Sequence, residues 1–150
     1  MASPADADSI AAVLHDAFVE YRRLYTPEGF SATAATVPAV LDRMKEGPVW
    51  IAALNQLIVG TVAAVPHGDS LYVRGMAILP GARGQGIGNK LLKHVEDHAR
   101  ASGFARMFLS TTPFLDRAIA LYEHFGFRRI AEGPHDIFGT PLFTMQKELV

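Results

Sequence analysis

Three closely spaced glycines constrain this chain more than any other feature of its sequence: residues 79–92 read LPGARGQGIGNKLL. Before them, LYVRGMAI is rich in the residues that strands favour. After them, the residues that recur at helical spacing are Ile87, Leu91, Leu92, Val95 and Ala99. A turn alone needs fewer glycines. The segment therefore predicts a strand, a loop and a helix, with a loop backbone that lies close to a ligand.

The position of this loop indicates the charge of its ligand. The first N–H groups of a helix have no partner within the helix, and the helix dipole makes that end mildly positive. Gly84, Gly86 and Gly88 can adopt positive φ angles and place no Cβ between the backbone and a bound group. The expected ligand is an anion with several oxygens, such as a phosphate or a pyrophosphate.

Two well-known phosphate-binding loops do not fit the sequence. A Walker loop ends in Gly-Lys followed by Ser or Thr, whereas this one ends in Gly-Asn-Lys. A Rossmann fingerprint that starts at Gly84 needs a third glycine where Asn89 stands, and the next strand ends in LSTT rather than in an acid. The remaining pattern is Arg83-x-x-Gly86-x-Gly88, after a strand that ends in MAILP.

The other segments predict a single domain over residues 1–150. A helix begins after Ser3 and reaches Tyr21, and a loop starts at Gly29. The further predicted elements are a helix at 37–46, strands at 49–54, 57–65 and 71–78, the helix after the glycine loop, which Gly103 ends, a strand at 107–111, a helix around 118–125, and strands at 127–133 and 141–148. This order predicts an α/β (α+β) fold, in which a mixed sheet carries helices on both faces.

One apolar stretch, residues 49–65, approaches the length of a membrane-spanning helix and carries no charge. However, Asn55-Gln56 interrupts it, and Pro48 and Pro66 flank it. Its Val, Ile, Trp and Thr residues favour strands. We therefore expect two strands joined at Asn55-Gln56 rather than a membrane helix.

The composition excludes several classes of site and partner. The chain has no cysteine, which removes disulfides, zinc–thiolate sites, iron–sulfur clusters and a cysteine nucleophile. Its net charge of −1 gives no broad attraction to nucleic acid or to a membrane surface, so we expect neither as a partner. The N-terminal sequence lacks a basic region followed by an apolar one, so we expect no signal peptide and a cytoplasmic location.

His94 and His98 stand one helical turn apart in the segment HVEDH. The segment matches neither HExxH nor HxxEH, and the sequence suggests no third ligand. We expect both histidines at the surface and no metal site.

The pattern Arg83-x-x-Gly86-x-Gly88 between a strand and a helix resembles the acetyl-CoA loop of the GNAT superfamily of N-acetyltransferases. AIALYEHFGF at 118–127 resembles the A-x-x-L-Y-x-x-x-G-F segment of that family, and IVGTV at 58–62 resembles its third strand. The resemblance covers residues 4–148. It implies a GNAT-like fold with a mostly antiparallel sheet, splayed where acetyl-CoA binds. The implied activity is acetyl transfer from acetyl-CoA to a primary amine of a small molecule or a peptide, by direct attack and without a metal.

The same resemblance assigns the acetyl-CoA to the glycine loop and the strand before it. The backbone of Met76, Ala77 and Ile78 would pair with the pantetheine arm like an added strand, at a splay beside Gly75. The Arg83 side chain would add charge near the phosphates. The loop residues implied in holding the CoA pyrophosphate are Arg83, Gly84, Gln85, Gly86, Ile87, Gly88 and Asn89, with Lys90 beside them.

Tyr122 matches the family's tyrosine near the thioester sulfur, and the resemblance implies that it is catalytic. A phenol keeps its proton at neutral pH and can therefore donate it to a departing thiolate. The alternative is a core tyrosine, because Ala118, Leu121 and Phe125 share its helical face.

The chain departs from the family pattern in two places. Leu115 stands where the family often has Asn, which removes one polar contact to the cofactor or to a water. The chain also starts almost at its PAD segment, which in the family follows a short first strand. That strand is either absent or encoded upstream of Met1, and its absence would leave a sheet edge for a homodimer partner to cover.

The acceptor and the general base stay open at this stage. Arg22 and Arg23 could meet a carboxylate of the acceptor or form a solvated helix face. A non-catalytic acyl-CoA sensor is the alternative to an acetyltransferase, since the phosphate loop would serve either. The residues considered as a base or as part of the acceptor rim are His67, Asp69, Tyr72, Arg74, Ser110, Glu132, His135 and Asp136.

Overall fold

A computed structural model describes residues 1–149 and contains a six-stranded sheet in the order β1-β2-β3-β4-β8-β5. β3 and β4 pair in parallel, and the other neighbouring pairs of this sheet are antiparallel, as expected. A separate two-stranded hairpin lies between β5 and β8 in the chain. The strands are β1 (Val49–Leu54), β2 (Leu57–His67), β3 (Ser70–Ile78), β4 (Arg106–Thr111), β5 (Arg128–Ile130), β6 (Asp136–Ile137), β7 (Thr140–Pro141) and β8 (Phe143–Glu148).

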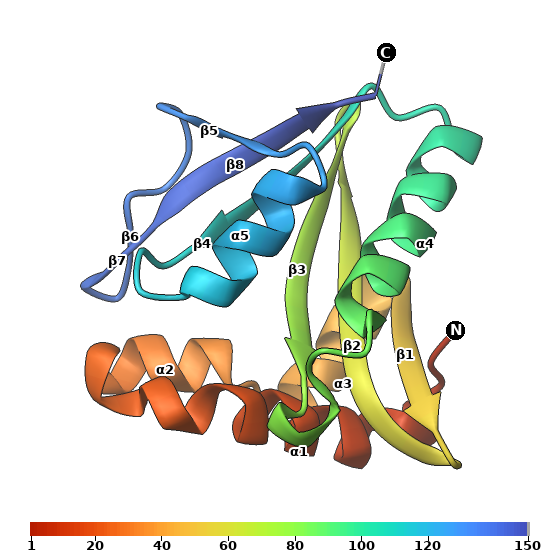
Figure 1. The fold of residues 1–150 in the computed structure, drawn as a ribbon, viewed down its shortest axis with the longest axis vertical. Coiled ribbons are helices and arrows are strands. Elements are labelled where there is room, and N and C mark those ends of the chain that lie inside the picture. Colours follow the sequence, from red (N-terminus) through yellow and green to blue (C-terminus); the bar gives the residue numbers. More distant parts are fainter. Residues whose placement is uncertain (150) are drawn as a thin grey trace.

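Helices cover both faces of the sheet, and each face has its own apolar core (Figure 1). On one face, α4 (Ile87–Ala101) and α5 (Asp116–His124) pack on the side chains of Trp50 and Val62. On the other, α1 (Ala7–Phe18) and α3 (Val37–Glu46) pack on Val49 and Ala63. Val62 and Ala63 are neighbours in β2, so successive side chains of one strand supply both cores.

β3 and β4 part soon after they begin to pair. Their ladder joins residues 70–72 to 106–108 and then ends, and Figure 1 shows the two strands diverging from there. β3 also carries a bulge against β2, because Thr61 pairs with Ala77 but Ala63 pairs with Arg74. Gly75 lies in this bulge with a φ of 59°, which a glycine adopts without strain. The expected splay of the sheet at Gly75 is thus confirmed.

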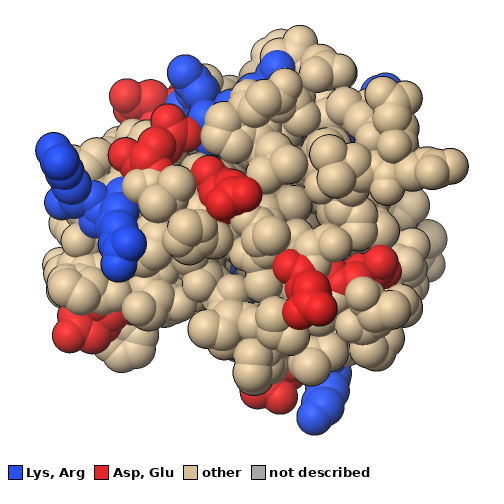
Figure 2. Space-filling model, turned by 90° about the horizontal axis from the view of Figure 1, so that it is seen from below, with Lys and Arg blue, Asp and Glu red and all other residues tan. Residues whose placement is uncertain are grey.

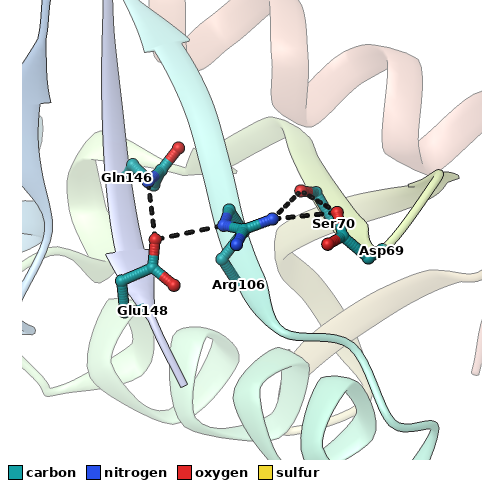
Figure 3. A network of polar contacts seen from close by, with 5 residues as sticks. All are labelled: Asp69, Ser70, Arg106, Gln146 and Glu148. Atoms are coloured by element: carbon teal, nitrogen blue, oxygen red, sulfur yellow. Dashed lines mark hydrogen bonds and ion pairs between the residues drawn. The ribbon is translucent and has the colours of Figure 1, made fainter. Parts of the chain in front are cut away.

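A polar network joins the strands at the closed end of this splay (Figure 3). Arg106 at the start of β4 donates from Nη1 to Asp69 Oδ1 at 2.8 Å, in the turn before β3. Its Nε donates to Glu148 Oε1 at 3.0 Å, at the end of β8, and Gln146 Nε2 donates to the same oxygen at 2.8 Å. The guanidinium therefore links the three strand ends that meet there.

One helix was not expected. α2 (Pro27–Thr33) occupies the segment that the sequence favoured as a loop from Gly29. Thr26 caps it by accepting a hydrogen bond from Gly29 N at 3.0 Å, and Pro27 stands at its first position. The Thr26 backbone N–H donates to Thr140 Oγ1 at 2.8 Å, which ties the start of α2 to the β6–β7 hairpin. A 3-10 helix over Val19–Leu24 precedes α2.

Residues 49–65 form strands, as predicted. Asn55 and Gln56 make the turn between β1 and β2 with φ angles of 50° and 68°. Among residues 1–149, no helix is long and apolar enough to cross a membrane. The residues described before α1 contain no strand, and Ala2 N donates to Val49 O at 2.8 Å on the outer edge of β1.

The Arg106 network predicts a pH-dependent stability. The hydrogen bond from Arg106, together with its charge, lowers the pKa of Asp69 below the ordinary value. A lowered folded-state pKa adds stability that is present above the unfolded pKa of about 4 and is lost as the pH falls through the folded value. Asp69→Asn should therefore lower the urea midpoint at neutral pH, and its difference from the wild type should shrink under acid conditions.

The control is the same substitution in an Arg106→Gln background, in which Asp69 has already lost the guanidinium that it pairs with. If the difference in urea midpoint between the wild type and Asp69→Asn stayed constant from neutral to acid pH, the charge of Asp69 would not stabilise the fold through Arg106.

Candidate active site

The glycine loop presents a row of free backbone donors. Within residues 1–149, no N–H group from Gly84 to Asn89 has a hydrogen-bond acceptor, and the first bond of α4 runs from Lys90 N to Gly86 O at 3.1 Å. Gly84 and Gly86 have φ angles of 82° and 77°. A Cβ on either would meet no atom within 4 Å. The space and the donors suit an anion with several oxygens, so the residues present fit a pyrophosphate.

The third glycine has a different role. A Cβ on Gly88 would lie 2.7 Å from Leu121 Cδ2 and 3.2 Å from Ile78 Cδ1. Gly88 therefore allows the first turn of α4 to pack closely on α5 and β3. Its contribution is to hold these elements together under the loop.

The Arg83 side chain turns towards α1 and the 3-10 helix after it. Its Nη1 donates to Glu20 Oε1 at 2.6 Å, and its Nη2 donates to Ala17 O at 3.2 Å. The guanidinium thus joins the loop to the opposite side of the site. Its suggested contact with phosphate stays a prediction, and in this structure its charge is paired with that of Glu20.

A cavity of about 300 Å³ runs from the glycine loop along the part of β3 that has separated from β4. The outer edge of β3 beyond Tyr72 has no strand partner on the β4 side, so its backbone groups are free to pair with an extended ligand. Gln85 and Lys90 do not line this cavity. The residues predicted from the sequence that do line it are Met76, Ala77, Ile78, Arg83, Gly84, Gly86, Ile87, Gly88, Asn89 and Tyr122.

A second, smaller cavity of about 150 Å³ adjoins the first. The residues that line both are Phe18, Met76, Leu115, Ala118 and Tyr122. The smaller cavity reaches into the gap between β3 and β4, where its lining includes side chains of both strands. We call the first the cofactor cavity and the second the acceptor cavity, after the two substrates that the sequence resemblance implies.

Tyr122 stands at the junction of the two cavities. It is 8% exposed, and its ring centroid lies 6.0 Å from that of Phe127. Its hydroxyl forms no hydrogen bond within the described residues. Burial, with a smaller contribution from Tyr25, raises the pKa of Tyr122 to about 12. The phenol therefore keeps its proton at any physiological pH.

The acceptor cavity contains residues that the sequence did not single out. Arg43 and Thr112 line it, together with Tyr72, Arg74 and Ser110, which had been considered as a base or rim. Arg43 could have been noticed as a charged residue one turn from Val40 on the inward face of a helix. Nothing in the sequence distinguishes Thr112.

Other residues considered from the sequence lie outside both cavities. Arg22 and Arg23 are exposed. Asp69 belongs to the Arg106 network, and Asp136 accepts a hydrogen bond from Gly139 N within the β6–β7 hairpin. His67, Glu132 and His135 also line neither cavity.

His94 and His98 both lie against the indole of Trp50. Their rings stand edge-on to Trp50, with centroids 5.3 Å and 5.2 Å from that of the indole. His94 is exposed, whereas His98 is half-buried, so the expectation of two surface histidines holds for the first of them. The described residues contain no group of His, Cys, Asp or Glu that could hold a metal ion.

Comparisons with known proteins agree with this geometry. The profile described as "Acetyltransferase (GNAT) family" matches residues 11–127. The chain belongs to the GNAT acetyltransferase family. It is 31% identical over 131 residues to the uncharacterized N-acetyltransferase YjgM of Escherichia coli, covering 83% of this chain and 78% of that protein.

Solved structures share the fold at low sequence identity. PaiA N-acetyltransferase from Thermoplasma acidophilum, in complex with coenzyme A, has a TM-score of 0.83 at 15% identity, over 98% of this chain and 95% of that one. YncA of Salmonella typhimurium, with its cofactor acetyl-CoA, has a TM-score of 0.74 at 21% identity, over 99% of this chain and 91% of that one. These structures share the GNAT fold with this chain, and the family match over residues 11–127 makes the chain an acetyltransferase of that family, as the sequence resemblance implied.

The loop geometry predicts that acetyl-CoA binding needs the open space beside Gly86, in addition to the positive φ angle that glycine allows there. Gly86→Ala places a methyl group in the open space beside the free amides, and acetyl-CoA affinity should fall at least about tenfold, roughly the loss of one to two hydrogen bonds. The matched control is Gly103→Ala at the other end of α4, where φ is 82° and a Cβ would also meet nothing within 4 Å.

Each variant should lose roughly 1–2 kcal/mol of the free energy of unfolding, because alanine is strained at positive φ. Isothermal titration with acetyl-CoA then separates the two. Equal affinities for Gly86→Ala and Gly103→Ala would mean that the phosphates bind elsewhere.

Proposed function

We propose that this protein transfers an acetyl group to a primary amine that binds in the acceptor cavity, by direct attack on acetyl-CoA in the cofactor cavity. The observation that supports this most strongly is the meeting of two cavities at Tyr122, in the gap between β3 and β4. Acetyl-CoA supplies the activated thioester. No cysteine is present to carry the acetyl group on the protein, which favours a single transfer step.

Two parts of the chain would hold the co-substrate. The free amides from Gly84 to Asn89 would donate to the pyrophosphate, and the positive end of α4 would favour its charge. The backbone groups of Met76, Ala77 and Ile78 on the side facing β4, which have no strand partner, would pair with the amide groups of the pantetheine arm. These contacts would place the thioester end near Tyr122.

During the transfer the amine must lose one proton, and the departing sulfur must gain one. The amine nitrogen forms a bond to the acetyl carbon, the carbon–sulfur bond breaks, and its electron pair remains on sulfur. We propose that the Tyr122 hydroxyl donates a proton to this sulfur, because it is protonated and lies where the cavities meet. Solvent would then restore the phenol.

The proton of the amine would go to water. Among the described residues, neither cavity is lined by Asp, Glu or His, so no ordinary side-chain base faces the acceptor. The cationic side chains of Arg43 and Arg74 line the acceptor cavity instead. Nearby positive charge disfavours an ammonium group, and the amine would therefore reach its neutral, attacking form more readily.

A direct assay follows release of the CoA thiol with a thiol-reactive chromophore, in the presence of acetyl-CoA and pooled primary amines. The chain has no cysteine, so the protein gives no thiol background. Amine-dependent release is the expected result. If acetyl-CoA raised the melting temperature but no amine in a broad pool caused release, acetyl transfer to a small amine would be wrong.

The role of Tyr122 predicts a specific change in kinetics. Tyr122→Phe should lower kcat by about 100-fold, the lower end of the usual range for a lost proton donor, and should change acetyl-CoA affinity little. Since the pKa of Tyr122 is raised to about 12, the ratio of wild-type to variant rates should stay constant from neutral to moderately alkaline pH. An unchanged kcat would exclude the proton-donor role.

A homodimer and a cytoplasmic location stay predictions from the sequence. β1 is an edge strand, and its outer side receives the bond from Ala2 N to Val49 O. Figure 2 shows acidic and basic side chains interspersed on one face of the molecule, without a continuous basic surface there. Light scattering on the purified protein would test the dimer.

A further inference from the structure

Arg43 reaches the gap between β3 and β4 because Gly75 has no side chain. A Cβ on Gly75 would lie 2.8 Å from Arg43 Nη1, so the guanidinium lies directly over the bulge in β3. Arg43 comes from α3, on the far side of the sheet from α4 and α5. It lines the acceptor cavity, next to the position of Met76, which lines both cavities.

The charge of Arg43 has no carboxylate partner among residues 1–149. Its one described hydrogen bond runs from Nη2 to Ala32 O at 3.3 Å. Glu46, one turn further along α3, pairs instead with Arg74 Nη1 at 3.5 Å, and Arg74 lines the same cavity. Burial and then the charge of Arg74 lower the pKa of Arg43 to about 10. A bound anion would offset both causes while the guanidinium stays charged at neutral pH.

A buried hydroxyl in the same cavity also lacks a partner. Thr112 is 3% exposed, and its Oγ1 forms no hydrogen bond of good geometry within the described residues. The Tyr25 phenol lies close to it: burial raises the pKa of that phenol, and the Thr112 hydroxyl lowers it in part. Buried polar groups of folded proteins nearly always have a partner in the protein, a water or a ligand. Thr112 is therefore a second polar group available to a molecule in the acceptor cavity.

The size and the lining of the acceptor cavity limit what it can hold. Its volume of about 150 Å³ is below the roughly 300–1,000 Å³ of sites for drug-sized ligands. Apolar side chains, among them Leu109 and Leu142, form part of its wall. The bond from Thr26 N to Thr140 Oγ1 ties α2 to the hairpin that contributes Ile137 to this wall. A small molecule with a compact apolar body fits these limits.

We propose that the acceptor is a small amino acid with a free carboxylate, which Arg43 binds while the amine faces Tyr122. This inference rests on the proposed function. Gly75 and Met76 are adjacent in β3, and Met76 lines both cavities, so the guanidinium over Gly75 lies beside the junction of the cavities. A peptide N-terminus would not satisfy Arg43, because its first carboxyl group is an uncharged amide.

The test compares each acid with its uncharged counterpart. Glycine, alanine, valine and β-alanine are assayed against their primary amides by CoA release, with wild type, Arg43→Gln and Arg23→Gln. Arg23→Gln is the matched control, since it removes the same charge from an exposed arginine outside both cavities. Binding of N-acetylalanine and N-acetylalaninamide by calorimetry gives a second readout that does not need turnover.

We expect the wild type to prefer an acid over its amide by about 10- to 100-fold in kcat/KM, the range of a charged hydrogen bond. Arg43→Gln should lose this preference, whereas Arg23→Gln should retain it. The acid-to-amide ratio of the wild type tests the site even if Arg43→Gln folds poorly.

Other outcomes separate this inference from the proposed function. Amides used as well as acids, or equal behaviour of the two arginine variants, would overturn the carboxylate site and leave the acetyltransferase intact. Arg43-dependent binding of N-acetylalanine without turnover of any amine would overturn the proposed function and leave the carboxylate site standing. Neither binding nor turnover would overturn both.

Discussion

The parting of β3 and β4 is the constraint on which the rest of the site depends. Three residue pairs hold the two strands together, and beyond them each strand has a free edge. The free edge of β3 borders the cofactor cavity, and the gap itself holds the acceptor cavity. The bulge at Gly75 bends β3 at the same place and leaves room for the Arg43 guanidinium. One local change in backbone pairing thus makes room for both cavities and for the Arg43 guanidinium.

The parts of this arrangement that rest on local patterns could be predicted from the sequence. The strands around Asn55-Gln56 and the helix after the glycine loop follow from hydrophobic periodicity and from turn chemistry, whereas the splay beside Gly75 was implied by the family resemblance. α2 was missed, although Thr26 and Pro27 gave the usual signal for the start of a helix. Gly29 and the small residues after it were given more weight than that cap.

The parts that depend on contacts between distant segments could not be predicted. The ion pair of Arg83 with Glu20 joins residues 63 positions apart, and nothing in either segment indicates it. The meeting of Arg43 with Gly75 likewise needs the packing of α3 on β3, although the inward position of Arg43 on an amphipathic helix was a signal. Gly88 was read as part of the phosphate loop, whereas its contacts with Leu121 and Ile78 explain it through packing.

The Arg106 network holds β3 and β4 together at the end where they still pair. It sits at the vertex of the V that β3 and β4 form, and the open arm of β3 from Val73 to Ile78 extends about 20 Å from it at roughly 3.3 Å per residue. β2 pairs with this arm along its length, so a tilt of the arm at the vertex would carry β2 with it. Because the same arm borders both cavities, such a tilt would widen or narrow them together. Arg106 lines neither cavity, yet its hydrogen bonds hold the strand ends at the vertex from which both cavities open.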